Sequence, residues 1–166
     1  MKKYLIAFVT FPVLFSCNNS SEEKTSENKD SSSHTDMHTT HAAVEMPPMP
    51  DVPTDAKVFF VNLKDGQTVT SPVKIEMGVI GMSVDTANGI LKPASGHHHI
   101  LIGMDSIATE TVVPKDSVHL HYGNAQTSAE VTLPPGKHIL TLQFADAMHR
   151  SYGTKLTSKV TVNVKK

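Results

Sequence analysis

An alternation of apolar and polar residues constrains the fold of this chain more than any other feature. Over residues 73–79 every second residue is Val, Ile or Met, and the residues between them are Lys, Glu and Gly. The same period of two recurs over 140–144 and 160–164. Successive side chains of a strand point to opposite faces, so this period indicates strands with one buried face. No segment after residue 17 keeps a period of 3.6, and we expect no helix there.

Shorter runs of the same kind, separated by turn signals rich in Gly and Pro, fill the rest of the chain from residue 55 onward. They predict further strands at 57–62, 98–103, 118–122 and 129–133. About seven short strands at regular spacing predict an all-β fold, an immunoglobulin-like β-sandwich over 55–166, with a small barrel as the alternative. The expected core is Val58, Phe60, Val73, Ile75, Met77, Ile100, Ile102, Leu140, Leu142, Phe144, Val160 and Val162.

The first seventeen residues have the layout of a secretory signal. Lys2 and Lys3 precede an apolar run from Tyr4 to Phe15, which is shorter than the roughly twenty residues of a membrane-spanning helix. The segment Leu14-Phe15-Ser16-Cys17 resembles the lipobox of bacterial lipoproteins. That resemblance implies a signal peptide over 1–16 and a lipid anchor, with fatty acids such as palmitate, on Cys17. The alternative is an ordinary signal peptide in which the cysteine is incidental.

These signals place the chain in the bacterial cell envelope, lipid-anchored to the outer membrane on its periplasmic or surface side. An acidic stretch at 20–23 resembles the export tag of surface-exposed lipoproteins, although a solvated charge cluster explains it equally well. Cys17 is the only cysteine, so no disulfide can form within the chain. With 15 basic and 16 acidic residues, the chain lacks the excess of positive charge that is typical of proteins that bind nucleic acid. The membrane is one expected partner and another envelope protein is a second.

Residues 17–54 read as the lipidated cysteine followed by a disordered tether, because Ser, Thr, Asn, Glu, Lys and Pro dominate and few residues could be buried. The tether also carries imidazole and thioether groups, a mixture that suits copper. An extended proline-rich spacer is the alternative reading of its last part. The candidate copper ligands are His34, Met37, His38, His41, Met46 and Met49.

Two histidine clusters dominate the predicted sandwich, one at 97–99 and one at 119–121. Side chains at i and i+2 of a strand share a face, so His97 pairs with His99 and His119 with His121, whereas His98 points the other way. Imidazole binds zinc, copper, iron and nickel. We therefore expect a transition-metal site, with copper favoured and zinc as the alternative, at His97, His99, His119 and His121. Accessory ligands or supporting groups are expected at His138, Asp146 and His149.

Four short sequence segments resemble an uncharacterised family of secreted bacterial domains, the domain of unknown function forty-three ninety-nine. They are the segments at 58–66, 96–99, 119–123 and 133–138. The Asp-x-x-His pattern of that family fits Asp146 to His149, and the residues at 150–152 depart from its His-Pro continuation. The resemblance implies no particular activity.

Sequence patterns of enzymes are missing from this chain: it has no nucleophile elbow, no phosphate-binding glycine loop and no His-Glu-x-x-His. Our hypothesis is therefore a metal-binding envelope lipoprotein rather than an enzyme. The rival is an immunoglobulin-like structural or interaction module whose histidines only shape loops. A metalloenzyme built on the histidines comes third.

Overall fold

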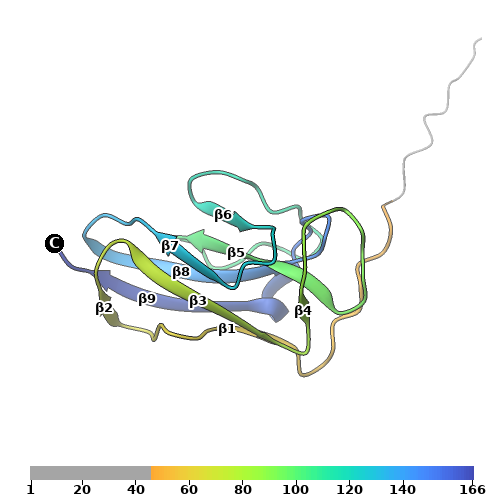
Figure 1. Ribbon diagram of the computed structural model, residues 1–166, viewed down its shortest axis with the longest axis horizontal. Coiled ribbons are helices and arrows are strands. Elements are labelled where there is room, and N and C mark those ends of the chain that lie inside the picture. Colours follow the sequence, from red (N-terminus) through yellow and green to blue (C-terminus); the bar gives the residue numbers. More distant parts are fainter. Residues whose placement is uncertain (1–45) are drawn as a thin grey trace, which may run out of the picture. The chain divides into compact units, whose positions relative to one another are not determined.

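The computed structural model describes residues 46–166. Nine strands and one short 3-10 helix follow one another along this part of the chain (Figure 1). They are β1 (Lys57–Phe60), β2 (Gln67–Val69), β3 (Val73–Ile80), β4 (Ser83–Val84), β5 (Ser95–Ile102), β6 (His119–Tyr122), β7 (Ser128–Val131), β8 (Gly136–Ala145), η1 (Gly153–Leu156) and β9 (Thr157–Val164).

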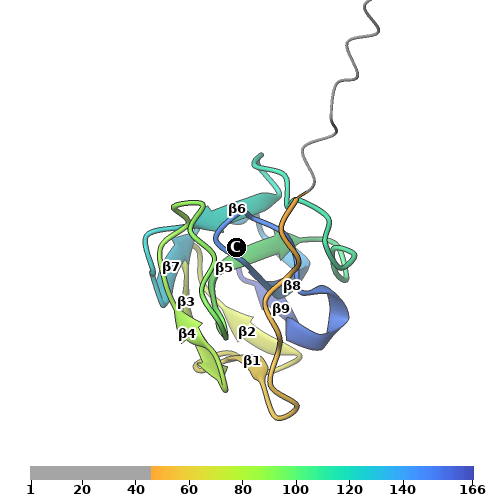
Figure 2. The ribbon, with the colours of Figure 1, turned by 90° about the vertical axis from the view of Figure 1, so that its right-hand side faces the viewer.

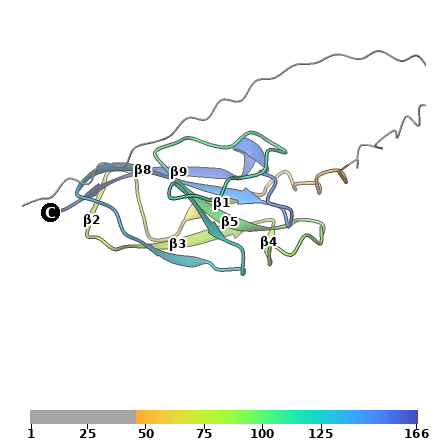
Figure 3. The same ribbon diagram turned by 90° about the horizontal axis from the view of Figure 1, so that it is seen from above.

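The strands form two sheets that pack face to face. One sheet has the order β1-β3-β7, and the other has the order β2-β9-β8-β5-β4, with β6 pairing β5 beside β4. In Figures 2 and 3 the strands β3 and β7 lie in one layer, while β8 and β9 lie in the other. The prediction of an all-β sandwich is confirmed.

The core lies between the two sheets and follows the predicted alternation. Every predicted core residue is buried except Phe60 and Ile102, which are half-buried and pack against the core. Strand β8 supplies Leu140, Leu142 and Phe144, which are fully buried. Burying a side chain of this size stabilises the fold by about 1.5–3 kcal/mol, so the central strand of the larger sheet is firmly fixed.

The outer face of the larger sheet is also covered. Here Leu101, Val113 and Ala145 form a second, small apolar cluster, against which Met104 and Ile107 pack. The loop that joins β5 to β6 crosses this face, where the Ile107 amide donates a hydrogen bond to Gln143 Oε1 over 3.0 Å. Side chains that point outward from the middle of β5 are therefore buried as well.

The segment immediately before β1 packs on the sandwich. Arg150 Nη1 donates a hydrogen bond to the Pro47 carbonyl oxygen over 2.6 Å, and Lys155 Nζ donates to the Val52 carbonyl oxygen over 2.9 Å. Met49 and Val52 are partly buried against the core. The domain boundary predicted at residue 55 leaves out these contacts, since composition reports the lack of apolar residues but not hydrogen bonds to the backbone.

All seven predicted strands are present, and the structure adds two short ones, β2 and β4, together with η1. Among the described residues no helix is long and apolar enough to cross a membrane. The predicted signal peptide, Cys17 and most candidate tether ligands, namely His34, Met37, His38 and His41, lie outside the described residues.

Candidate metal centre

Strand pairing brings the two histidine clusters together. In the antiparallel register of β5 and β6, His99 lies directly opposite His121, and directly opposed residues point to the same face. His97 is two residues before His99 and shares that face. His98 points into the core on the other side, where its ring meets Phe144 edge-on at a centroid distance of 4.9 Å. The predicted opposition of His98 to its two neighbours is confirmed.

The three imidazoles converge on a small volume. One ring nitrogen from each of His97, His99 and His121 lies within 4.8 Å of the others. The Nε2 atoms of His97 and His99 are 2.8 Å apart. A tetrahedral ion with nitrogen ligands at about 2.0–2.1 Å separates those nitrogens by about 3.3 Å. The three side chains can therefore hold a metal ion after small ring movements.

A fourth imidazole joins them from a distant loop. His149 Nε2 lies 3.1 Å from His121 Nε2, and the ring centroids of His149 and His97 are 5.0 Å apart. We define the four-histidine cluster as His97, His99, His121 and His149. It combines ligands from β5, from β6 and from the loop after β8.

Asp146 folds the loop that carries His149. Its Oδ1 accepts hydrogen bonds from the Met148 and Arg150 amides at 2.8 and 2.9 Å. Its Oδ2 accepts one from Arg150 Nε at 2.7 Å in an ion pair that is almost completely buried. His149 is consequently held at φ 67°, a left-handed conformation that is uncommon outside glycine. Asp146 thus positions a histidine in this structure, and both of its oxygens are engaged.

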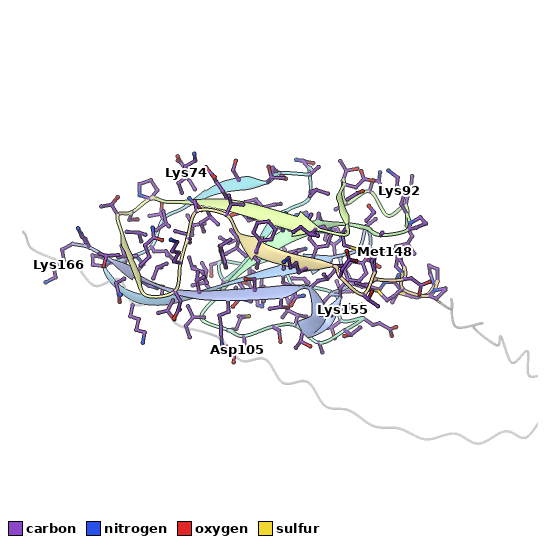
Figure 4. All side chains as sticks on the ribbon, turned by 90° about the horizontal axis from the view of Figure 1, so that it is seen from below. Lys74, Lys92, Asp105, Met148, Lys155 and Lys166 are labelled. Carbon is purple, nitrogen blue, oxygen red and sulfur yellow. The ribbon has the colours of Figure 1, made fainter. Side chains whose placement is uncertain are left out.

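The loop that carries His149, which we call the 146–150 turn, lies at the end of the sandwich opposite the C-terminus. The positions of Met148 and Lys166 show this (Figure 4). His97 and His99 are 0 % and 1 % exposed, whereas His121 and His149 are half-buried. The cluster therefore has a buried side on β5 and a side nearer solvent on β6 and the 146–150 turn.

Burial keeps the inner histidines neutral. Loss of solvent, and to a smaller extent the neighbouring imidazoles, lowers the pKa of His97 to about 3 and that of His99 to about 2. Burial is the main cause that lowers the pKa of His121, and the nearby His149 ring is the second cause. A neutral imidazole has one nitrogen lone pair free for a metal. The pKa shifts thus leave His97, His99 and His121 in their metal-binding protonation state at neutral pH.

Two glycines make room for the cluster. A Cβ at Gly123 would lie 2.3 Å from Cε1 and Nε2 of His121, and a Cβ at Gly96 would lie 2.3 Å from the Ala145 carbonyl oxygen. Such distances are far below van der Waals contact. Gly123 lets the His121 ring lie against the β6 turn, while Gly96 permits the close approach of β5 and β8 just before His97.

His119 has a different partner. It lies on β6 two residues before His121, but its Nδ1 is 2.9 Å from both carboxylate oxygens of Asp116. Asp116 is further held by the amides of Val118 and His119. The structure therefore brings together three of the four predicted ligands, His97, His99 and His121, while His119 pairs with the end of the loop that covers the sheet.

The structure gives the remaining candidates within the described residues other surroundings. His138 Nε2 bonds the Pro134 carbonyl oxygen over 2.8 Å, Met46 is exposed, and Met49 packs against the core. Arg150, which fixes Asp146, was not among the predicted site residues. Its position four residues after Asp146 was the available signal, but that spacing indicates a pair only once a helix or turn is known.

Fold and site together define an all-β domain with a histidine cluster that can hold a metal ion. The model of the family described as domain of unknown function DUF4399 matches residues 75–165, more than half of the chain, and the chain belongs to this family. The resemblance inferred from the four sequence segments is confirmed. No curated protein and no solved structure matches the chain.

Proposed function

We propose that this protein is a cell-envelope lipoprotein whose β-domain binds a transition-metal ion, with copper favoured, through the four-histidine cluster. The single observation that carries this proposal is the convergence of the imidazoles. The pairs His97–His99 and His121–His149 each place two Nε2 atoms within 3.1 Å. Neutral rings can share only one hydrogen bond per pair, and converging lone pairs repel, whereas one cation attracts all of them.

Two buried ring atoms in the cluster carry a cost that metal coordination through the Nε2 atoms would have to offset. The Nδ1 atoms of His97 and His99 have no hydrogen-bond partner among the described residues. Buried polar groups normally have partners, and an unpaired one costs about 1–3 kcal/mol. Coordination by several nitrogens is a source of free energy large enough to offset such a cost.

Copper is favoured because of what precedes the domain. Thioether and imidazole side chains at positions 34–49 are the mixture that binds both copper oxidation states. The chain meets the domain at Pro47, whose carbonyl oxygen bonds Arg150, the neighbour of His149. We propose that these side chains capture or hand over the ion to the cluster. The lipid on Cys17 would hold the protein at the outer membrane.

An immunoglobulin-like structural or interaction module is the second candidate. It is favoured by the same Nε2 contacts, since 2.8 and 3.1 Å are also ordinary hydrogen-bond lengths. In that case the histidines would serve only to hold β5, β6 and the 146–150 turn together. Another envelope protein would then be the partner.

Thermal unfolding with and without metal separates the two candidates. The mature chain carrying Cys17→Ser would be melted with Cu(I) under anaerobic conditions, and with Cu(II), Zn(II) and Ni(II), at free concentrations up to about a hundred times Kd. A metal that binds only the folded state then adds about 2.7 kcal/mol, and a domain of about 120 residues gains on the order of 10 °C.

The variant His121→Ala/His149→Ala should lose the shift, and His119→Ala should keep it because that ring is held by Asp116. His138→Ala serves as the control. If no metal shifts the wild-type melting temperature, the histidines are structural and the second candidate replaces the first.

A further inference from the structure

We infer that the four-histidine cluster selects a monovalent soft ion, Cu(I), over divalent ions. This inference rests on the proposed function and adds to it the charge of the ion. It follows from a count of the charges around the cluster, which shows what the site provides to balance a buried cation.

The cluster offers no negative charge. Its four ligands are imidazoles, which are neutral when they bind a metal, and among the described residues the group of convergent ligands contains no carboxylate. The nearest buried acid in the sequence, Asp146, has both oxygens occupied by Arg150 and by turn amides. Its charge is therefore already balanced by a guanidinium that is itself 3 % exposed.

The buried surroundings are neutral, and the acid that pairs with His119, Asp116, has a side chain that is 49 % exposed to solvent. The buried polar side chains that share the outer face of β8, Thr141 and Gln143, are uncharged and are bonded to the covering loop. A bound divalent ion would thus keep its full charge beside a region that water does not reach.

Charge then decides between the ions. The cost of moving an ion out of water rises with the square of its charge, so an uncompensated divalent ion costs about four times as much as a monovalent ion of similar size. Among divalent ions the Irving–Williams order favours Cu(II) at nitrogen ligands, so Cu(II) is the divalent ion that competes most strongly with Cu(I). With His97 and His99 completely buried, we expect the desolvation cost to dominate.

Competition titrations test the selectivity directly. The mature chain carrying Cys17→Ser, with no His-tag, would be titrated with Cu(I) and Ag(I) against a colorimetric Cu(I) chelator under anaerobic conditions. Parallel titrations would use Cu(II) and Zn(II) against chelators of known affinity. The same titrations of His121→Ala/His149→Ala measure how much of each affinity comes from thioethers outside the cluster. We expect Cu(I) and Ag(I) to bind the cluster at least 100-fold more tightly than Zn(II) and Cu(II).

A charge-adding variant tests the cause. His149→Asp supplies the missing negative charge and should move the ratio of divalent to monovalent affinity at least tenfold toward Zn(II) and Cu(II). His138→Asp, which adds the same charge beside Pro134, should leave the ratio unchanged. His121→Asp is the second variant if His149→Asp does not fold.

The outcomes separate the two proposals. Tighter binding of Cu(II) or Zn(II) by the wild-type cluster, or a ratio that the aspartate variants do not change, overturns the inference while the metal site stands. Binding of none of the four ions by the cluster overturns the proposed function itself.

Discussion

Acid should unfold the metal-free domain because of three buried histidines. Burial lowers the pKa of His97, His98 and His99 from the ordinary value of 6.5 to about 3, about 4 and about 2. Between these values and 6.5 the unfolded chain binds protons that the folded domain does not. Stability is therefore complete above about pH 7.5 and falls as the pH drops through 6.5.

The magnitude follows from the same pKa values. One pH unit is worth about 1.4 kcal/mol for each group that protonates only on unfolding. Between pH 7.5 and 5.5 each of the three histidines should remove about 1.4 kcal/mol, which gives about 4 kcal/mol in total. Single domains are stable by about 5–15 kcal/mol. The metal-free domain should therefore lose a large part of its stability by pH 5.5.

Urea unfolding of chelator-treated protein at a series of pH values between 5 and 8 measures this slope. His98→Leu provides the matched variant, because His98 lies on the core side against Phe144 and outside the four-histidine cluster. It should reduce the loss between pH 7.5 and 5.5 to about 3 kcal/mol. A loss below about 1 kcal/mol in the wild type, or an unchanged slope in the variant, would refute the account of buried neutral histidines.

Three further substitutions test separate parts of the structure. Gly123→Ala should displace the His121 ring, since its Cβ would lie 2.3 Å from that ring, and should weaken metal binding at least tenfold in a competition assay. Asp146→Ala leaves Arg150 buried without a counter-charge and should lower the free energy of unfolding by about 3–5 kcal/mol in urea. Cys17→Ala should move the protein from the membrane fraction to the soluble fraction of cells or leave its signal peptide uncleaved.

A specific result would contradict each of these three predictions. The control for the buried ion pair is Lys159→Met, which breaks the exposed pair with Asp105 and should cost less than about 1 kcal/mol. Equal losses in this control and in Asp146→Ala would remove the argument from burial. Full metal affinity in Gly123→Ala would show that His121 does not need its place against the turn. Unchanged acylation and membrane partitioning of Cys17→Ala would exclude the lipid anchor.

The alternation of apolar residues was sufficient to predict the sandwich, because a strand with one buried face leaves a visible period of two. It located β3, β8 and β9 along with the four shorter predicted strands. It missed β2 and β4, which contain three and two residues and cannot display a period. The contacts of Pro47 and Val52 were also out of reach, since backbone carbonyl groups carry no sequence signal.

The candidate site was predictable in part for a related reason. The i and i+2 rule placed His97 with His99 on one face, but it could not choose between His119 and His121 as their partner. That choice depends on the register, in which His121 rather than His119 lies opposite His99. A shift of two residues would exchange them. His149 was predicted only as an accessory ligand or supporting group, because the loop that brings its ring to His121 depends on hydrogen bonds to Asp146, which no periodicity records.

The central claim is that one metal ion binds where the four imidazoles converge, and metal content measures this most directly. Protein carrying Cys17→Ser and no His-tag would be loaded with each ion in turn, passed through a desalting column and assayed for metal and protein by element analysis. The account predicts close to one ion per chain for wild type and for His138→Ala, and a clear loss for His121→Ala/His149→Ala. Equal metal content in wild type and in that double variant, or none in either, would contradict it.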